Sequence, residues 1–343
     1  MRRKIYIGWF FVALAAMSCA REDVAPDGGD KIAFYVKTQQ AVSASSRALI
    51  EDTDDLLAKR LPLYVTGEGS KTLTNIAVDY TANGVWQSNE EWIGGQEYTF
   101  YAYIASPLQT ATSTQGGVSN ISNNGKILTL QQPTIYSADE DVWADYLLSY
   151  RVGANGSNKG LVKLDLERVT ACVELYMARS AKVGEVNITE IEFKNVVTKA
   201  TFGISYHAVP KDEEDSYGMK NTWIVTPDEN SKATYTFNPT SPLNTYTESD
   251  DRFDVKYRQM RFLTIPQTLI DGATLFVSYT VDENGTTANY QSDFTLSDYT
   301  PRAWYRGHKI RYFIGIDTSI KLEGFIEPWK SVDYIETTLL PKN

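Results

Sequence analysis

Side chains that commonly catalyse reactions or bind metals are sparse in this sequence and lie far apart. Of its 343 residues only two are histidines, His207 and His308, and neither has a Cys, His or Glu at metal-ligand spacing. Acidic clusters at 52–55, 212–215 and 248–251 lack the sharp-turn Gly and distal Glu of a calcium loop. There is no Gly-rich phosphate loop and no Gly-x-Ser-x-Gly elbow. The sequence therefore predicts no metal site and no cofactor, and it favours a protein that is not an enzyme.

Covalent chemistry of another kind is predicted near the N-terminus, at Cys19. A basic head and an apolar run at 5–17 form a secretory leader, and the run is shorter than the ~20 residues of a membrane-spanning helix. Ala16-Met17-Ser18-Cys19 resembles the bacterial lipoprotein signal, in which the cysteine is acylated and becomes the new N-terminus. Residues 1–18 are then a lipoprotein signal peptide, and Cys19 holds outer-membrane lipid. The alternative is an ordinary secretory peptide with an incidental cysteine.

The segment 19–47 ends at an arginine that a protease could reach. Ile32, Phe34 and Val36 alternate along a short run, so they are expected on one face of a strand. Residues 38–46 are small and polar, which places Arg47 and Ala48 in an extended, accessible segment. The residues alone leave two interpretations open: an N-terminal strand followed by a loop arginine, or a removable strand with a cut after Arg47.

Composition and turn signals predict an all-β chain. Tyrosine is abundant, with 22 residues, and aromatic residues make up 12% of the sequence, a composition typical of pleated, half-buried surfaces. Asn-Gly pairs at 83–84, 124–125 and 284–285 predict tight hairpin turns, since a type I′ turn requires positive φ at two residues. Short strand-like runs separated by turns are typical of an antiparallel sandwich.

Length and one flexible stretch predict two domains. A chain of 343 residues exceeds the size of an ordinary single core. The segment 151–160 is dense in Gly, Asn and Ser, which predicts a linker and a boundary near residue 155. This gives an N-terminal β-sandwich at 48–155 and a C-terminal β-sandwich at 156–343. Within the latter, the acidic insertion 208–252 is expected to pair in part at Tyr235-Thr236-Phe237.

The net charge, the remaining cysteine and the tryptophans limit which classes of ligand the chain is expected to bind. The net charge of −10 repels phosphate backbones and argues against nucleic acid. Cys172 lies in an apolar run and is expected to be a buried thiol. Spacing leaves open a carboxylate pair for glycoside hydrolysis, because such groups meet only in the fold. Tryptophans such as Trp86, Trp92, Trp143 and Trp329 are either core residues or exposed platforms for a sugar.

Several short motifs together resemble the fimbrillin family, the lipoprotein-derived pilus subunits. They occur in order along almost the whole chain. One departure is Arg168, where the family often has His. The motifs are Tyr98–Tyr103 followed by Pro107, Asp145-Tyr146-Leu147-Leu148, Leu164–Ala171, Ile265-Pro266-Gln267, Gly307–Tyr312 and Ile326–Trp329.

The resemblance implies a fold, a processing step and a mode of assembly. The fold would be two antiparallel β-sandwich domains in tandem, of transthyretin-like or Greek-key type. An arginine-specific protease would cut after Arg47 and remove the lipidated propeptide 19–47. A strand of another pilus subunit would then fill the gap by donor-strand exchange, and because donor and acceptor surfaces differ, an open filament results.

The tail offers a candidate donor strand. Val332, Tyr334, Thr338 and Leu340 share one face, although Glu336 interrupts the apolar stripe. An equally simple interpretation makes the tail the last strand of its own sandwich. Three functions remain: a polymerising fimbrial subunit with a role in adhesion to a host or bacterial surface, an uncut anchor or accessory fimbrial lipoprotein, and a surface glycan-binding lipoprotein using exposed tryptophans.

Overall fold

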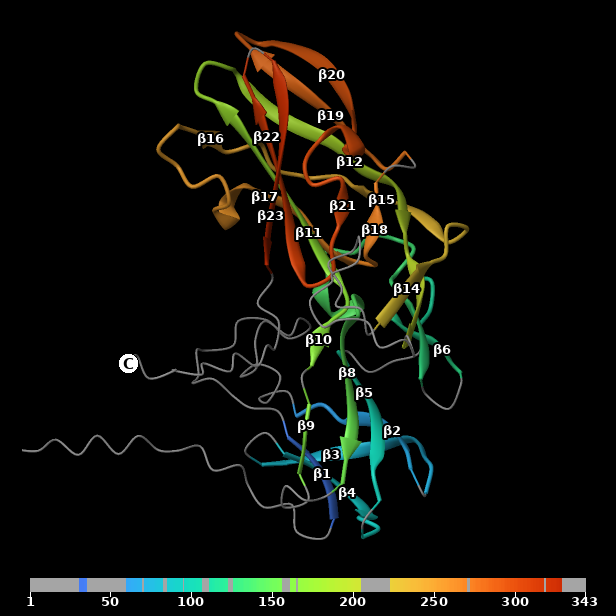
Figure 1. The fold of residues 1–343 in the computed structure, drawn as a ribbon. Coiled ribbons are helices and arrows are strands. Elements are labelled where there is room, and N and C mark those ends of the chain that lie inside the picture. Colours follow the sequence, from blue (N-terminus) through green and yellow to red (C-terminus); the bar gives the residue numbers. More distant parts are fainter. Residues whose placement is uncertain are drawn as a thin grey trace, which may run out of the picture.

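The computed structural model describes residues 31–35, 60–69, 71–82, 85–94, 96–106, 111–122, 126–155, 161–164, 166–204, 223–269, 272–317 and 319–328. Its sheets follow one another along an elongated molecule (Figure 1). Within the described residues, the helices are single 3-10 turns at Glu140–Val142, Val255–Tyr257 and Leu296–Asp298. None of the helices in the described ranges is long and apolar enough to cross a membrane. The all-β prediction is confirmed.

The first sheet has eight strands in the order β10-β8-β5-β2-β3-β4-β1-β9. Strands β8 and β9 are far apart in this order, yet they contact each other. The sheet therefore curves, and it encloses an apolar core. The bounds are β1 Lys31–Tyr35, β2 Leu63–Glu68, β3 Leu73–Ala82, β4 Val85–Glu91, β5 Tyr98–Ser106, β8 Asp145–Ala154, β9 Leu161–Lys163 and β10 Glu167–Arg168.

Strand β5 is buried on both faces, which explains its unbroken run of apolar and aromatic residues. Phe100 and Ile104 point into the core enclosed by the first sheet. Tyr101 and Tyr103 belong to a second core on the opposite face. A strand with two buried faces cannot alternate between apolar and polar residues. The aromatic motif therefore marks the layer that separates two cores.

A four-stranded sheet covers that second core and draws strands from both halves of the chain. Its order is β14-β13-β7-β6. Strand β13 pairs with β7 at five positions, from Lys199↔Gln131 to Gly203↔Ile127. The two halves are thus joined by a backbone ladder as well as by the chain itself. The bounds are β6 Gly117–Ser122, β7 Ile127–Gln131, β13 Lys199–Ile204 and β14 Trp223–Pro227.

The rest of the chain forms a two-sheet sandwich around the largest core. One sheet has the order β16-β11-β22-β23, with β17 also paired to β11, and the other has the order β15-β12-β19-β20. A two-stranded sheet joins β18 and β21. The bounds are β11 Ala171–Ser180, β12 Glu185–Val197, β15 Lys232–Phe237, β16 Thr245–Tyr246, β17 Arg258–Thr264, β18 Gln267–Thr268, β19 Thr274–Glu283, β20 Thr286–Thr295, β21 Ala303–Trp304, β22 His308–Ile316 and β23 Ile320–Pro328.

Several local predictions can be compared with these strands. The antiparallel prediction holds for most pairs, but β1–β9, β11–β16 and β11–β22 are parallel. Asn284 and Gly285, between the antiparallel strands β19 and β20, have φ values of 53° and 79°, as a type I′ turn requires. The other two predicted Asn-Gly turns, at 83–84 and 124–125, lie outside the described residues. The expected pairing at 235–237 is confirmed, since β15 pairs with β12 there.

The predicted linker needs a correction. Strand β8 continues to Ala154 and pairs there with Tyr98, so the first four residues of the stretch 151–160 are sheet rather than linker. The Gly153 backbone has φ 69°, a positive value that glycine adopts without steric cost. A glycine inside a strand commonly marks an irregularity in the pairing. Strands β9 and β10 follow residue 155 yet pair with β1 and β8. The two-domain division near residue 155 stays a prediction.

Candidate functional site

Strand β1 lies between two other strands of the first sheet. It pairs antiparallel with β4, through Phe34↔Trp86 and Tyr35↔Val85, and parallel with β9, through Phe34↔Val162. The Ser88 hydroxyl donates a further hydrogen bond of 2.7 Å to the Ile32 carbonyl. In Figure 1, β1, β3, β4 and β9 lie together at the lower end of the molecule. Removing β1 would leave the facing backbone edges of β4 and β9 without partners.

The side chains of β1 are an integral part of the core. Ile32 and Phe34 are 1% and 0% exposed. The Phe34 ring packs edge-on against Phe100 at a centroid distance of 5.1 Å, a favoured aromatic geometry. Burying two such side chains contributes about 1.5–3 kcal/mol each. The prediction that Ile32 and Phe34 share one buried face is confirmed.

The opposite face of β1 is buried too, which the sequence did not indicate. Ala33 and Tyr35 are 0% and 8% exposed and form a small cluster with Val85 and Leu161. The alternation Ile32/Phe34 suggested one apolar face only. The second face is apolar because β4 and β9 bring their own side chains to it, and those contacts are distant in sequence.

The other predicted site residues lie outside the described ranges. These are Val36, the lipidation site Cys19, the processing site Arg47 and Ala48, and the donor-strand residues Val332, Tyr334, Thr338 and Leu340. The described chain stops at Pro328, the last residue of β23. Strand β1 is therefore the part of the predicted machinery that can be read in atomic detail.

A buried ion pair joins β8 to β10 in the first sheet, close to the point where this sheet meets the C-terminal sandwich. The Arg168 guanidinium donates to the Asp145 carboxylate, and both side chains are fully buried. The Thr170 hydroxyl donates to the other Asp145 oxygen at 2.9 Å. Gly307, next to β22, donates from its backbone N–H to the Thr170 carbonyl at 2.8 Å. The Asp145, Arg168 and Gly307 motifs of the sequence thus meet at one junction.

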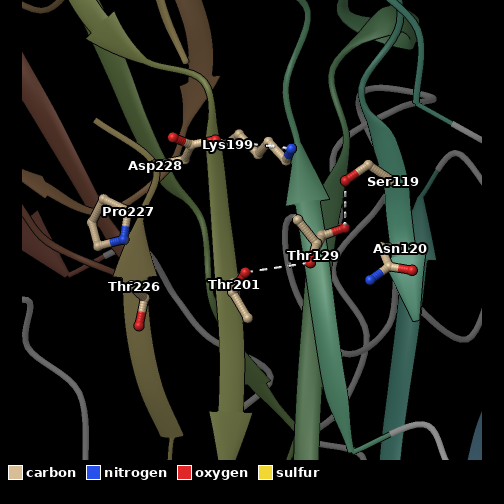
Figure 2. Close-up of a pocket in the computed structure, with 8 residues that line it drawn as sticks. All are labelled: Ser119, Asn120, Thr129, Lys199, Thr201, Thr226, Pro227 and Asp228. Atoms are coloured by element: carbon tan, nitrogen blue, oxygen red, sulfur yellow. Dashed lines mark hydrogen bonds and ion pairs between the residues drawn. The ribbon is translucent and has the colours of Figure 1, made fainter. Parts of the chain in front are cut away.

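Figure 2 shows a shallow polar hollow on the outer face of the four-stranded sheet. Thr129 and Thr201 share a 3.3 Å hydrogen bond, and Lys199 lies 3.8 Å from Asp228. Hydrogen bonds from Ser231 and the Asn230 backbone lower the pKa of Asp228, so it stays ionised and is a poor general acid. The hollow of about 420 Å³ is lined by Ser119, Asn120, Thr129, Lys199, Thr201, Thr226, Pro227 and Asp228.

This lining does not suit glycoside hydrolysis or sugar stacking. Asp228 is its only carboxylate, whereas glycosidases use two. It also has no aromatic ring on which a sugar could stack. We therefore assign no catalytic or sugar-binding role to the hollow.

The tryptophans that the structure describes with their side chains are core residues rather than exposed platforms. Trp86, Trp143 and Trp304 are at most 1% exposed, and each indole N–H donates to a protein oxygen. Trp92 is half-buried and packs edge-on against Tyr98. Of the two alternatives that the sequence left open, Trp86 and Trp143 follow the core interpretation, because the cores of the two halves enclose them. Trp329 lies outside the described residues.

The remaining side chains that could react or bind a metal are buried or already contact other protein groups. Cys172 is fully buried, which confirms the predicted buried thiol, and this burial raises the pKa of the thiol to about 11. The His308 ring contacts the Arg306 carbonyl through Nδ1 at 2.7 Å. Among the described residues, no group of three or more His, Cys, Asp or Glu side chains could hold a metal ion.

Comparison with solved structures finds matches among Bacteroides proteins. A fimbrial protein from Bacteroides vulgatus is 14% identical and has a TM-score of 0.51, with 82% of this chain and 97% of that chain covered. A candidate cell adhesion protein from Bacteroides uniformis is 12% identical, with a TM-score of 0.49 and coverage of 89% and 100%. The first likeness shows that this fold occurs in a fimbrial protein.

Family comparison is more specific. The sequence model described as fimbrillin-like matches residues 23–329. The chain belongs to the fimbrillin-like family, as the motif order predicted. No curated protein sequence matches the chain significantly.

Proposed function

We propose that this fimbrillin-like chain is a polymerising subunit of a cell-surface fimbrium. In this proposal the chain is exported as a lipoprotein acylated at Cys19, and a protease then cuts after Arg47. The propeptide 19–47 leaves with β1, and a strand of the next subunit replaces it. The assembled fimbrium extends from the outer membrane and has a role in adhesion.

The placement of β1 is the observation that carries this proposal. Its residues precede Arg47 in sequence, yet they are enclosed between β4 and β9, which follow Arg47. A cut after Arg47 would leave β1 held by hydrogen bonds and core packing alone. Its departure would expose two strand edges and the cavity of Ile32 and Phe34, which an incoming apolar strand can fill.

Replacing Arg47 with Ala tests the processing step. We expect the Arg47→Ala precursor to stay uncut and to form no filaments in electron micrographs, because β1 stays linked to the chain and keeps its place. Wild-type filaments should contain subunits that begin at Ala48. Arg60→Ala is the matched control, since Arg60 is the next arginine and is exposed. Filaments of Arg47→Ala subunits that begin at acylated Cys19 would instead support an uncut anchor or accessory role.

The tail residues 331–340 are proposed as the donor strand. Tyr334 lies on the predicted apolar face and would occupy space left by β1, so Tyr334→Asp should abolish filaments by placing a charge in an apolar core. Thr337→Asp changes the opposite face of the same segment and should preserve them. Electron microscopy of both variants after complete processing provides the comparison. Equal filament yields from the two variants would exclude this segment as the donor.

A further inference from the structure

Strand β20 is an open edge of the C-terminal sandwich. It pairs with β19 through ten consecutive positions, from Glu283↔Thr286 to Thr274↔Thr295, without a register shift. Within the described residues no strand pairs with its other side. In Figure 1 it lies on the outer side of β19 at the upper end of the molecule. A regular ten-residue edge presents a full row of backbone groups to another strand.

The other edge strands of the described sheets carry the usual protections against such pairing. Proteins commonly protect sheet edges with charges, prolines, bulges or short strands. Strand β20 has one charged residue, Asp293, and Lys194 lies 3.9 Å from its carboxylate. Elsewhere, β15 has Lys232 and a bulged pairing, β6 has a bulged pairing, β14 has five residues and ends in Pro227, and β23 has Lys321, Glu323 and Glu327.

The side chains of β20 add an uncovered aromatic surface to this edge. Tyr290 is 48% exposed and stacks on Tyr279 of β19 at 5.3 Å. Further along the same face, Phe294 is 7% exposed, so the sandwich covers one end of β20 and leaves the other open. An incoming strand would therefore gain an aromatic contact near the middle of the ladder.

We propose that β20 pairs antiparallel with β20 of a second copy, centred on Tyr290. The strand is complementary to itself in this register: Tyr290 faces the partner's Tyr290, and Asp293 faces Thr287 of the partner subunit. No like charges lie opposite each other. The alternative described edges would bring charged side chains, a proline or a bulge to the contact.

One such pairing is small, so its effect depends on repetition. A single strand edge buries less than the roughly 1,200–2,000 Å² of a stable interface, and isolated subunits should associate weakly. Along a filament the edge would recur once per subunit, and many weak contacts add up. This consequence rests on the proposed function: β20 would be the lateral contact that bundles fimbriae.

Paired cysteines test the register in isolated subunits. The variant is the full chain with Cys19→Ser, to which Asn289→Cys and Gln291→Cys are added. In the proposed register, position 289 of one copy lies opposite position 291 of the second copy, within the distance that a disulfide can bridge. We expect a covalent dimer under mild oxidation. The control is Thr234→Cys with Thr236→Cys, because both are exposed at the same spacing on edge strand β15 of the same sheet. Equal cross-linking at the two edges, or none at β20, would overturn the proposal.

A charge at the centre of the ladder provides the second test. Tyr290→Lys places like charges opposite each other, and cross-linking through positions 289 and 291 should fall about fivefold. In assembled material the same variant should give single filaments where the wild type gives bundles. Unchanged cross-linking would count against the proposed register. Absence of filaments from the wild type itself would count against the fimbrial function and would leave the dimer result to decide the β20 contact.

Discussion

The Asp145→Ala variant is expected to lose about 3–5 kcal/mol of unfolding free energy, the usual cost of removing one partner of a buried ion pair. Arg168 is fully buried and would keep its charge without the carboxylate. Thr170 would also lose its acceptor. Urea unfolding followed by tryptophan fluorescence can measure the change, because Trp143 lies two residues from Asp145 in the C-terminal core.

Two companion variants separate charge burial from general damage at this junction. Tyr146→Phe removes a buried hydroxyl that has no hydrogen-bond partner among the described residues, so stability should change little. Adding Arg168→Met to Asp145→Ala should recover much of the loss, because the double variant no longer buries a charge that has lost its carboxylate. A double variant as unstable as the single one would show that the junction depends on the geometry of the pair rather than on neutralising Arg168.

The Phe34→Ala variant of the uncut precursor should lose about 3–5 kcal/mol, as expected for a large aromatic side chain removed from a packed core. Phe34 is fully buried and contacts the Phe100 ring. Lys31→Ala is the control from the same strand, since Lys31 is exposed and should tolerate the change within about 0.5 kcal/mol. Thermal unfolding of both precursors gives the comparison.

The same pair of variants also bears on assembly. If β1 is the element that is replaced, weakening its hold should speed its departure after the cut, and Phe34→Ala subunits should polymerise faster than wild type. Lys31→Ala subunits should polymerise at the wild-type rate. Slower polymerisation of Phe34→Ala with normal processing would contradict the idea that leaving of β1 precedes assembly.

Local patterns predicted the strands well because their causes are local. The alternation of Ile32 and Phe34 predicted β1, and the Asn284-Gly285 pair predicted the turn between β19 and β20. Tyr235-Thr236-Phe237 was expected to pair inside an acidic insertion and lies in β15. In each case a few neighbouring residues contain the information, namely a period of two or a required positive φ.

Pairings between distant segments could not be predicted in this way. The parallel pairing of β11 with β22 joins residues more than 130 positions apart, and neither strand differs in pattern from an antiparallel one. The sheet of β7 and β13 crosses the predicted domain boundary for the same reason. Asp145 did offer a signal: a single acid beside Trp143, Ala144 and Tyr146 is costly to bury without a cation. Only the fold identifies Arg168 as that cation.

The ladder between β7 and β13 has a mechanical consequence. Strand β12 leads through Thr198 directly into β13, so tension on the C-terminal sandwich passes along one continuous run of backbone into the shared sheet. Strand β13 is held on both sides, by β7 and by β14, with five residue pairs on each. A force along β13 loads all of these backbone hydrogen bonds at once, in shear. A force perpendicular to the strand would instead break them one after another. The two halves of the subunit should therefore behave as one stiff link when the chain is stretched.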